Sequence, residues 1–319
     1  MMQNPGRTFF GKIMLFGEYS VICQGRALTV PLKQFSASWS APSKHYDHSE
    51  VALNQEMKDY LLALVRSEEN EGINYGIDLN AFALDLLRGY YLNSDIPRGS
   101  GLGSSGALVA SVYERFAPNP IPFAPLPAFK SLKRLQRILA QLESHFHGIS
   151  SGLDPLSCYV GKPLVIDPVY GPITVSLPSK PLHHKGGFFL ADTRLQRKTD
   201  ELVNGFMKDY QKVPFRNMIH DMYTPVVDFC MDALLKGNSD ELLRGFRHLS
   251  SMQMHHFNPM IPKGFEELWE EGLESGRFYL KLCGAGGGGF LLGYTHNFQE
   301  TIPVLKSAGT SLIPLNINA

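Results

Sequence analysis

The stretch that decides the fold is Pro97-Arg98-Gly99-Ser100-Gly101-Leu102-Gly103-Ser104-Ser105-Gly106, which leads into the helix-forming run Ala107 to Ala110. Its four glycines let the backbone approach a ligand closely, and the first N–H groups of a following helix have no intrahelical partner. Such a segment can surround a polyphosphate with backbone donors at the positive end of a helix dipole. We therefore expect a phosphate-binding loop here, and a plain flexible loop is the alternative.

A dinucleotide-binding turn is a competing interpretation, because Gly101 to Gly106 fits the GxGxxG pattern. That turn requires a strand directly before it and an acidic residue about 20 positions later. Pro97 and Arg98 precede the glycines, and the proline-rich segment 118–127 takes the place of the second strand. A hydride-transferring enzyme is therefore disfavoured.

Two further segments carry glycine and lysine. Gly6 to Lys12 fits GxxxxGK but continues with Ile13 instead of Ser or Thr, so an ordinary P-loop is missing and Lys12 must be solvated or paired. Lys281 to Gly289 connects a strand-like run to the apolar residues that begin at Phe290. Because core-like residues flank these glycines, we expect a tight backbone packed against another element or a ligand, rather than a linker.

Two carboxylates complete a set of groups suited to phosphoryl transfer. Glu143 lies on a predicted amphipathic helix with His147 one turn later, and Asp154 lies just before Pro155. Asp154 either caps a helix or orients and deprotonates an alcohol, with Lys12 stabilising the developing charge. Magnesium prefers hard oxygen ligands, which Glu143 and Ser105 would supply together with phosphate oxygens.

Composition narrows the class of protein. The chain has 319 residues, 44% of them hydrophobic, which favours two domains, and 30 basic residues balance 30 acidic ones. This balance excludes a basic field that would hold nucleic acid or an anionic membrane. The scattered cysteines form no CxxC pair and indicate buried thiols in a reducing compartment. With no apolar leader or membrane span in the sequence, we expect a cytoplasmic protein whose partner is a small molecule.

Hydrophobic periodicity predicts the elements around these segments. The region 7–30 indicates strands interrupted by turns at Gly11, Gly17 and Gly25. Helical spacing is expected around residues 57–65, 79–87 and 132–146, and 118–127 is expected to be an exposed connection. From residue 185 onward an α+β unit is predicted, with strands at 187–191 and 277–282 and helical stretches at 200–211, 213–235, 239–254 and 264–274.

The three segments in this order resemble the three motifs of the GHMP kinase superfamily, whose members include galactokinase, homoserine kinase, mevalonate kinase and phosphomevalonate kinase. Gly11 to Tyr19 is similar to the first motif, Pro97 to Gly106 to the second, and Lys281 to Gly289 to the third. The resemblance implies ATP and Mg²⁺ as cofactors, Asp154 and Lys12 as catalytic residues, and Ser105 and Glu143 as metal ligands. It implies ATP binding by Pro97, Gly99, Gly101, Leu102, Gly103, Ser104, Ser105 and Gly106.

Within the superfamily, the segment from Glu143 to Asp154 resembles mevalonate kinases. This likeness implies transfer of the ATP γ-phosphate to the hydroxyl of mevalonate in isoprenoid precursor synthesis. The sequence leaves the oligomeric state open, with a homodimer as one alternative. The likeness also implies substrate binding by Glu18, Tyr19, His147, Ser151, Gly152, Arg197, Thr199, Gly286 and Gly287.

Three departures from the mevalonate kinase pattern leave other acceptors open. Tyr19 replaces the usual histidine, as in phosphomevalonate kinases, Gly106 replaces an alanine, and the proline common before Ser151 is missing. The alternatives are phosphomevalonate kinase, another kinase of the superfamily, a decarboxylase and a non-catalytic nucleotide-binding protein.

The family fold is a two-domain α/β structure. It implies a ribosomal protein S5 domain 2-like domain over residues 1–180 and a ferredoxin-like domain over 181–319.

Overall fold

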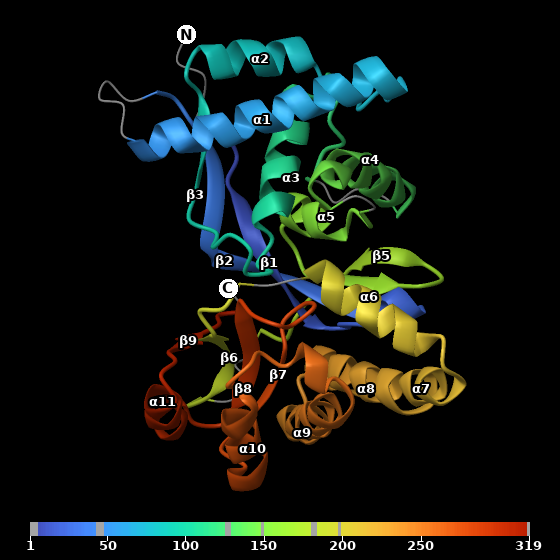
Figure 1. Ribbon diagram of the computed structural model, residues 1–319, viewed down its shortest axis with the longest axis vertical. Coiled ribbons are helices and arrows are strands. Elements are labelled where there is room, and N and C mark those ends of the chain that lie inside the picture. Colours follow the sequence, from blue (N-terminus) through green and yellow to red (C-terminus); the bar gives the residue numbers. More distant parts are fainter. Residues whose placement is uncertain are drawn as a thin grey trace. The chain divides into compact units, whose positions relative to one another are not determined.

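The computed structural model describes residues 6–42, 48–124, 129–147, 150–179, 184–196 and 199–317. The chain divides into two compact units, and Figure 1 shows the order of their elements. Unit 1 comprises residues 1–12, 31–98 and 102–162, and unit 2 comprises residues 13–30, 99–101 and 163–319. The mixture of helices and strands confirms the α/β class, while the predicted domain division near residue 180 stays a prediction.

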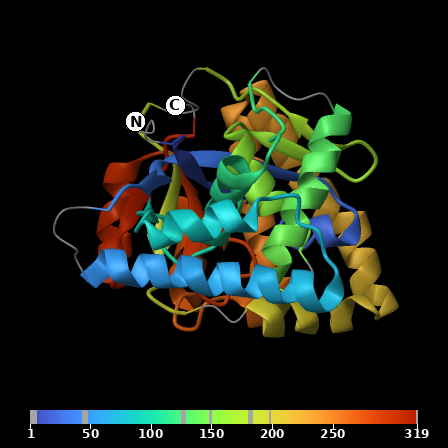
Figure 2. The same ribbon diagram turned by 90° about the horizontal axis from the view of Figure 1, so that it is seen from above.

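Unit 1 consists mainly of helices. They are α1 (His48–Glu71), α2 (Leu79–Leu87), α3 (Ser104–Phe116), α4 (Phe129–His147) and α5 (Leu153–Val160). Figure 2 shows α1 and α2 side by side. The short strand β3 (Tyr91–Ser94) pairs antiparallel with the last residues of the long strand β2 (Ala27–Ser40).

Helix α3 forms the centre of unit 1. Its residues from Gly106 to Tyr113 are all buried, which is the burial expected of a helix that is apolar on every side. Trp39 and Phe82 both pack on Phe116 at the end of this helix, with ring centroids 5.5 and 4.6 Å away. Helices α4 and α5 also contact α3, so the N-terminus of α3 is fixed by packing on several sides.

Unit 2 contains two groups of strands. The beginning of β2 pairs antiparallel with β4 (Leu164–Asp167), which pairs with β5 (Gly171–Thr174), and β1 (Phe9–Phe16) enters this unit at Ile13. A second, antiparallel sheet has the order β7-β8-β6-β9. Its strands are β6 (Gly187–Asp192), β7 (Phe278–Leu282), β8 (Phe290–Thr295) and β9 (Leu312–Pro314).

The helices of unit 2 follow one another between β6 and β7, except for the last. They are α6 (Thr199–Tyr210), α7 (Val213–Met218), a π-helical turn (Ile219–Tyr223), α8 (Thr224–Lys236), α9 (Ser239–His256), α10 (Glu266–Ser275) and α11 (Phe298–Ser307), with 3-10 turns at Val21–Cys23 and Asn258–Met260.

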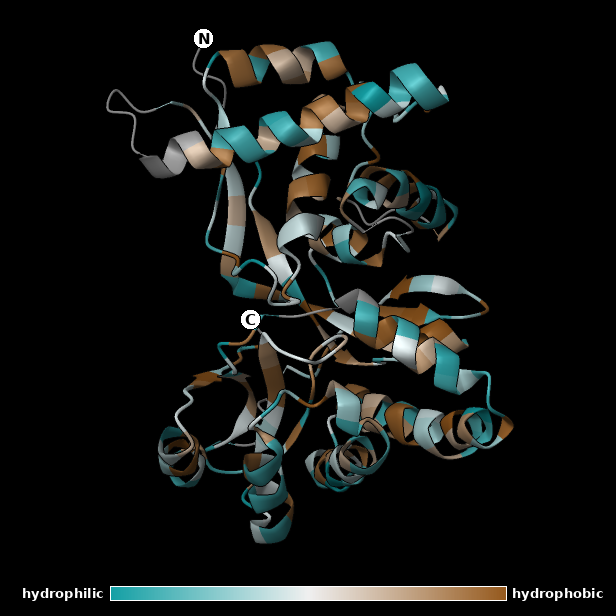
Figure 3. Cartoon of the chain, in the orientation of Figure 1, coloured by the Kyte–Doolittle hydropathy of each residue, from teal (hydrophilic) through white to brown (hydrophobic). Residues whose placement is uncertain are grey.

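Every residue of β7 and β8 is buried, and Figure 3 shows hydrophobic residues along these strands beside the mostly hydrophilic α10. Phe188, Phe246 and Tyr294 pack together at the centre of this core.

Most predicted elements are confirmed, including the bounds of α2 and the helix that follows the glycine-rich loop. The expected break at Gly11 is wrong, because β1 continues through this residue. A Cβ atom at Gly11 would lie 3.0 Å from the carbonyl oxygen of Leu102, so glycine here permits close approach of two backbones and does not make a turn. The strand β3 ends at Ser94, three residues before Pro97, and its antiparallel pairing does not match a dinucleotide-binding unit.

All four cysteine side chains are buried, as predicted. None of the helices within the described ranges combines the length and the apolar character that a bilayer span requires. The predicted connection after Pro118 is irregular and largely exposed as far as Ala124, where the described part of this segment ends.

Candidate active site

The ion pair between Lys12 and Asp154 lies at the centre of the candidate site in unit 1. Lys12 Nζ lies 2.7 Å from Asp154 Oδ1, and the lysine side chain is only 6% exposed whereas that of Asp154 is 38% exposed. Lys12 comes from β1 and Asp154 from the first turn of α5, 142 positions later in the chain. A buried lysine must be paired, and here its partner is a carboxylate that solvent or a ligand can still reach.

The glycine-rich loop adjoins this pair. Lys12 N donates to the carbonyl oxygen of Leu102 at 2.8 Å, which fixes the loop to β1. Gly103 has a left-handed backbone with φ of 85° and forms the N-cap of α3. A Cβ atom at Gly103 would lie 2.9 Å from Cγ of Lys12, so the lysine stem occupies the space that a side chain would need. The loop therefore brings the N-terminus of α3 to the Lys12 side chain.

Helix α3 also contacts the backbone that carries Asp154. A Cβ atom at Gly106 would lie 2.9 Å from the carbonyl carbon of Asp154 and 3.0 Å from the nitrogen of Pro155. Ser104 and Ser105 lie between Gly103 and Gly106, in the first turn of the helix, at the positive end of its dipole. An anion placed beside Lys12 would thus meet the positive end of α3.

Glu143 is a second carboxylate beside the pair, and it is almost completely buried. Burial, followed by the nearby charge of Asp154, raises the pKa of Glu143 from its ordinary 4.5 to about 7, although the Ser150 hydrogen bond and the Lys12 charge act in the opposite direction. Ser150 Oγ donates to Glu143 Oε2 and accepts from Gly152 N at 2.9 Å. The Glu143 carboxylate is therefore held in place by Ser150, and a cation beside it would stabilise its ionised form.

A magnesium ion fits this set of groups only if a ligand completes its coordination. Within the described ranges no cluster of three or more His, Cys, Asp or Glu side chains could hold a metal ion. Magnesium in phosphate sites usually takes one or two protein oxygens together with phosphates and water. The buried carboxylate of Glu143 lies on α4, which contacts the helix α3 that carries Ser105 in its first turn, and it would supply one such oxygen.

The predicted substrate-binding residues fall into three groups. In unit 1, Ser151 and Gly152 form the entry to α5, and the carbonyl of Ser151 accepts from Gln136 Nε2 at 2.9 Å. In unit 2, Glu18 and Tyr19 are buried and bonded to residues of the third motif, which also contains Gly286 and Gly287. Arg197 and the side chains of His147 and Thr199 lie outside the described residues.

The third glycine-rich segment has the tight packing that its apolar flanks predicted. A Cβ atom at Gly286 would lie 2.3 Å from the carbonyl oxygen of Met260, and Gly287 N donates to the same oxygen at 2.6 Å. A Cβ atom at Gly288 would lie 2.6 Å from the carbonyl oxygen of Leu195. The glycines therefore allow this backbone to pack against two other chain segments.

Sequence reasoning overlooked two residues that contact the site. Ser150 holds Glu143, and its place two residues before Gly152, typical of a hydroxyl turn, was a usable signal. Cys158 Sγ lies 3.6 Å from the carbonyl oxygen of Gly103. Burial raises the pKa of the Cys158 thiol and keeps it protonated. No sequence signal distinguishes this cysteine from the other buried thiols.

A family model covers the region that contains most of these groups. Residues 61–162 match the model described as the GHMP kinases N terminal domain, which includes the glycine-rich loop, Glu143 and Asp154. No curated protein matches the chain.

Solved structures of kinases share the fold over nearly the whole chain. Galactokinase from Lactococcus lactis, complexed with galactose, is 15% identical, covers 98% of this chain and 93% of its own, and has a TM-score of 0.67. Mevalonate kinase from Methanococcus jannaschii is 15% identical, covers 99% of both chains and has a TM-score of 0.63. Phosphomevalonate kinase from Streptococcus pneumoniae, in complex with phosphomevalonate and AMPPNP, is 16% identical, covers 97% of this chain and 98% of its own, and has a TM-score of 0.62.

Proposed function

Because residues 61–162 match the GHMP kinase N-terminal domain and the chain has the fold of GHMP kinases, we propose that this protein is an ATP- and Mg²⁺-dependent kinase that phosphorylates the hydroxyl of mevalonate. The observation that carries the proposal is the ion pair between Lys12 and Asp154. This pair lies next to the N-terminus of α3, and the buried carboxylate of Glu143 lies beside it. GHMP kinases are phosphotransferases with alcohol acceptors, and this set of groups suits that chemistry.

Each group has a distinct role in the proposed reaction. Asp154 accepts a hydrogen bond from the acceptor hydroxyl and takes its proton, because its carboxylate is the reachable half of the pair. Lys12 stabilises the negative charge that develops on that oxygen. The phosphates bind along the loop from Pro97 to Gly106, where left-handed glycines and the start of α3 direct N–H groups to them.

Glu143 and Ser105 would hold magnesium together with phosphate oxygens. Bound Mg²⁺ neutralises the charge that builds up on the transferred phosphoryl group. Ser150 keeps Glu143 oriented for that purpose. Most of the rate enhancement would come from positioning and charge, since phosphoryl transfer needs little covalent participation of the protein.

Phosphomevalonate kinase is the second candidate, because a solved phosphomevalonate kinase and a solved mevalonate kinase resemble the chain almost equally. An acceptor that already carries a phosphate requires additional cations around it. Among the residues predicted to bind the acceptor, only Arg197 is a permanent cation, which suits the single carboxylate of mevalonate. The segment from Glu143 to Asp154 also resembles mevalonate kinases, and we therefore favour mevalonate.

A coupled ADP-release assay with separate acceptors tests this proposal. Mevalonate, phosphomevalonate, homoserine and galactose would each be supplied with Mg-ATP. We expect turnover on mevalonate and at most slow turnover on the others. Turnover on phosphomevalonate alone would select the second candidate, release of carbon dioxide would indicate a decarboxylase, and ATP binding without turnover on any acceptor would contradict the kinase assignment.

A further inference from the structure

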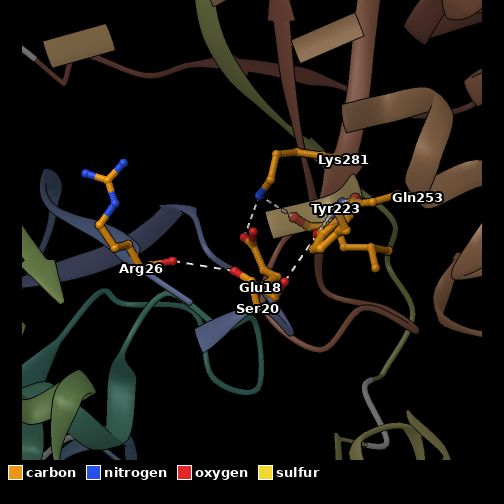
Figure 4. Close-up of polar contacts among 7 residues, drawn as sticks. Glu18, Ser20, Arg26, Tyr223, Gln253 and Lys281 are labelled. Carbon is orange, nitrogen blue, oxygen red and sulfur yellow. Dashed lines mark hydrogen bonds and ion pairs between the residues drawn. The ribbon is translucent and has the colours of Figure 1, made fainter. Parts of the chain in front are cut away.

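A closed ring of hydrogen bonds in unit 2 begins and ends on Glu18 (Figure 4). Lys281 Nζ donates to Glu18 Oε1 at 2.5 Å and to the carbonyl oxygen of Leu282 at 2.7 Å. Leu282 N donates to Gln253 Oε1, and Gln253 Nε2 donates to the Tyr223 hydroxyl, each at 2.7 Å. The Tyr223 hydroxyl donates to the carbonyl oxygen of Glu18 at 3.2 Å and closes the ring.

The ring is excluded from solvent. The side chains of Lys281 and Glu18 are 0% and 1% exposed, and Gln253 and Tyr223 are buried as well. Only one oxygen of the Glu18 carboxylate is satisfied, since Oε2 finds no hydrogen-bond partner among the described residues. A buried ion pair of this kind is poor evidence for stability alone, because desolvation offsets much of the attraction, but it specifies one arrangement of the groups that it joins.

The residue after Glu18 adds a second anchor. Tyr19 has a positive φ of 64°, which is uncommon for a residue other than glycine, so its conformation must be imposed by its surroundings. Its ring packs on Phe206 and Phe257, with centroids 4.4 and 5.3 Å away. Its hydroxyl donates to the carbonyl oxygen of Ala285 at 2.7 Å. The hydroxyl thus contacts the third glycine-rich segment directly.

Both anchors act on the same stretch of backbone. The ring fixes Leu282, two residues before Gly284, and Tyr19 fixes Ala285. Further along, Gly289 N donates to the carbonyl oxygen of Leu195 at 2.8 Å. Glycines have the greatest conformational freedom of all residues, so a segment with five of them between Gly284 and Gly289 keeps one shape only where other groups hold it.

We propose that Glu18, Lys281 and Tyr19 are positioning residues that hold the segment Gly284 to Gly289 in the conformation that binds the acceptor. This inference rests on the proposed kinase function and refines it. Glu18 and Tyr19 affect acceptor binding through the glycine segment, because both residues are buried, with Glu18 Oε1 bonded to Lys281 and the Tyr19 hydroxyl bonded to Ala285. Lys281, which carries no assigned role in the reaction, becomes a determinant of acceptor affinity.

Hydrogen–deuterium exchange tests the positioning directly and needs no turnover. Tyr19→Phe removes the hydroxyl and leaves the ring in place. We expect the amides of residues 284–289 to exchange roughly 3- to 10-fold faster in this variant, the scale of one lost hydrogen bond. The matched control is Tyr159→Phe, which removes a part-buried tyrosine-to-carbonyl hydrogen bond of 2.6 Å to Ile121 in unit 1 and should leave that exchange unchanged.

Kinetics then separate positioning from a general loss of stability. Tyr19→Phe and the paired variant Glu18→Gln with Lys281→Met should raise the acceptor KM by roughly 3-fold or more, while ATP affinity, measured without acceptor, changes by less than about twofold. Wild-type exchange rates in Tyr19→Phe would overturn the inference, as would an equal loss of ATP and acceptor affinity. If the wild-type protein turned over none of the acceptors, the proposed function would be wrong. The exchange rates would then still test whether Tyr19 holds the segment from Gly284 to Gly289.

Discussion

Asp154 differs from the other charged residues of the site in being within reach of a ligand while paired with a buried lysine. If it orients the acceptor and takes its proton, Asp154→Asn should lower kcat by at least about 100-fold, because an amide cannot accept the proton. ATP affinity should stay within a few-fold of the wild type, since we propose that the phosphates bind along the glycine-rich loop and not to Asp154. Steady-state kinetics and equilibrium nucleotide binding check both expectations.

The control for this variant is Asp209→Asn. Asp209 forms an ion pair of the same 2.7 Å length with Lys212 on an exposed surface, where such pairs contribute little. The Asp209→Asn variant should therefore have the kcat of the wild type. Near-normal turnover in Asp154→Asn would remove its catalytic role and leave the ion pair with Lys12 as a structural contact.

The buried carboxylate of Glu143 predicts a pH dependence of stability. Its pKa is raised from 4.5 to about 7, so between these values the folded protein binds more protons than the unfolded chain does. In the absence of magnesium, the free energy of unfolding should therefore fall as the pH rises from about 4.5 to about 7, by up to about 3 kcal/mol from this group.

Glu143→Gln isolates that effect. The variant should lose this part of the pH dependence in urea unfolding and be more stable than the wild type above pH 7 without metal, while it loses magnesium-supported activity. Identical pH dependence in the variant and the wild type would show that Glu143 ionises in the folded protein as it does in the unfolded chain.

At the scale of secondary-structure elements, the packing of α3 on α5 sets the distance between the glycine-rich loop and Asp154. Gly106→Ala places a methyl group 2.9 Å from the carbonyl carbon of Asp154, closer than such contacts occur. We expect a loss of roughly 1–3 kcal/mol in the free energy of unfolding, together with lower kcat, because α5 must move and take Asp154 with it. Urea unfolding and steady-state kinetics measure the two effects.

Gly205→Ala is the matched control for that substitution. Gly205 is also in a helix, but no atom outside its neighbourhood in the helix lies within 4 Å of a Cβ placed there. This variant should be neutral or more stable by about 0.5–1 kcal/mol, as is usual for glycine to alanine in a helix. If Gly106→Ala behaved in the same way, the close packing of α3 on α5 would not be what positions Asp154.

These elements also show what the sequence could predict. Local patterns were sufficient for the bounds of α2 and for the presence of α3 after the glycines, although α3 begins at Ser104, three residues before the predicted run at Ala107. The role of Gly11 was missed because it depends on Leu102, which lies 91 positions away. The Lys281–Glu18 pair joins residues 263 positions apart and has no local signal at all. Ser150 lay within the segment compared with mevalonate kinases, yet its bond to Glu143 depends on how α4 ends and α5 begins.

For the whole molecule, the claim is that one chain binds Mg-ATP and passes its γ-phosphate to an alcohol. The family match covers residues 61–162, and the fold extends the likeness over at least 97% of the chain in the three kinase structures compared. Fold likeness at 15–16% identity leaves the acceptor open, since galactokinase, mevalonate kinase and phosphomevalonate kinase share this architecture. The acceptor must therefore be identified from the product.

The most direct measurement follows the label of [γ-³²P]ATP into product, with the wild type and Asp154→Asn assayed side by side on mevalonate, phosphomevalonate, homoserine and galactose. The account predicts a labelled phosphoester of mevalonate with the wild type, and at least about 100-fold less label with Asp154→Asn at equal nucleotide occupancy. Label transfer by Asp154→Asn at the wild-type rate, or no transfer by the wild type to any of the four acceptors, would contradict it.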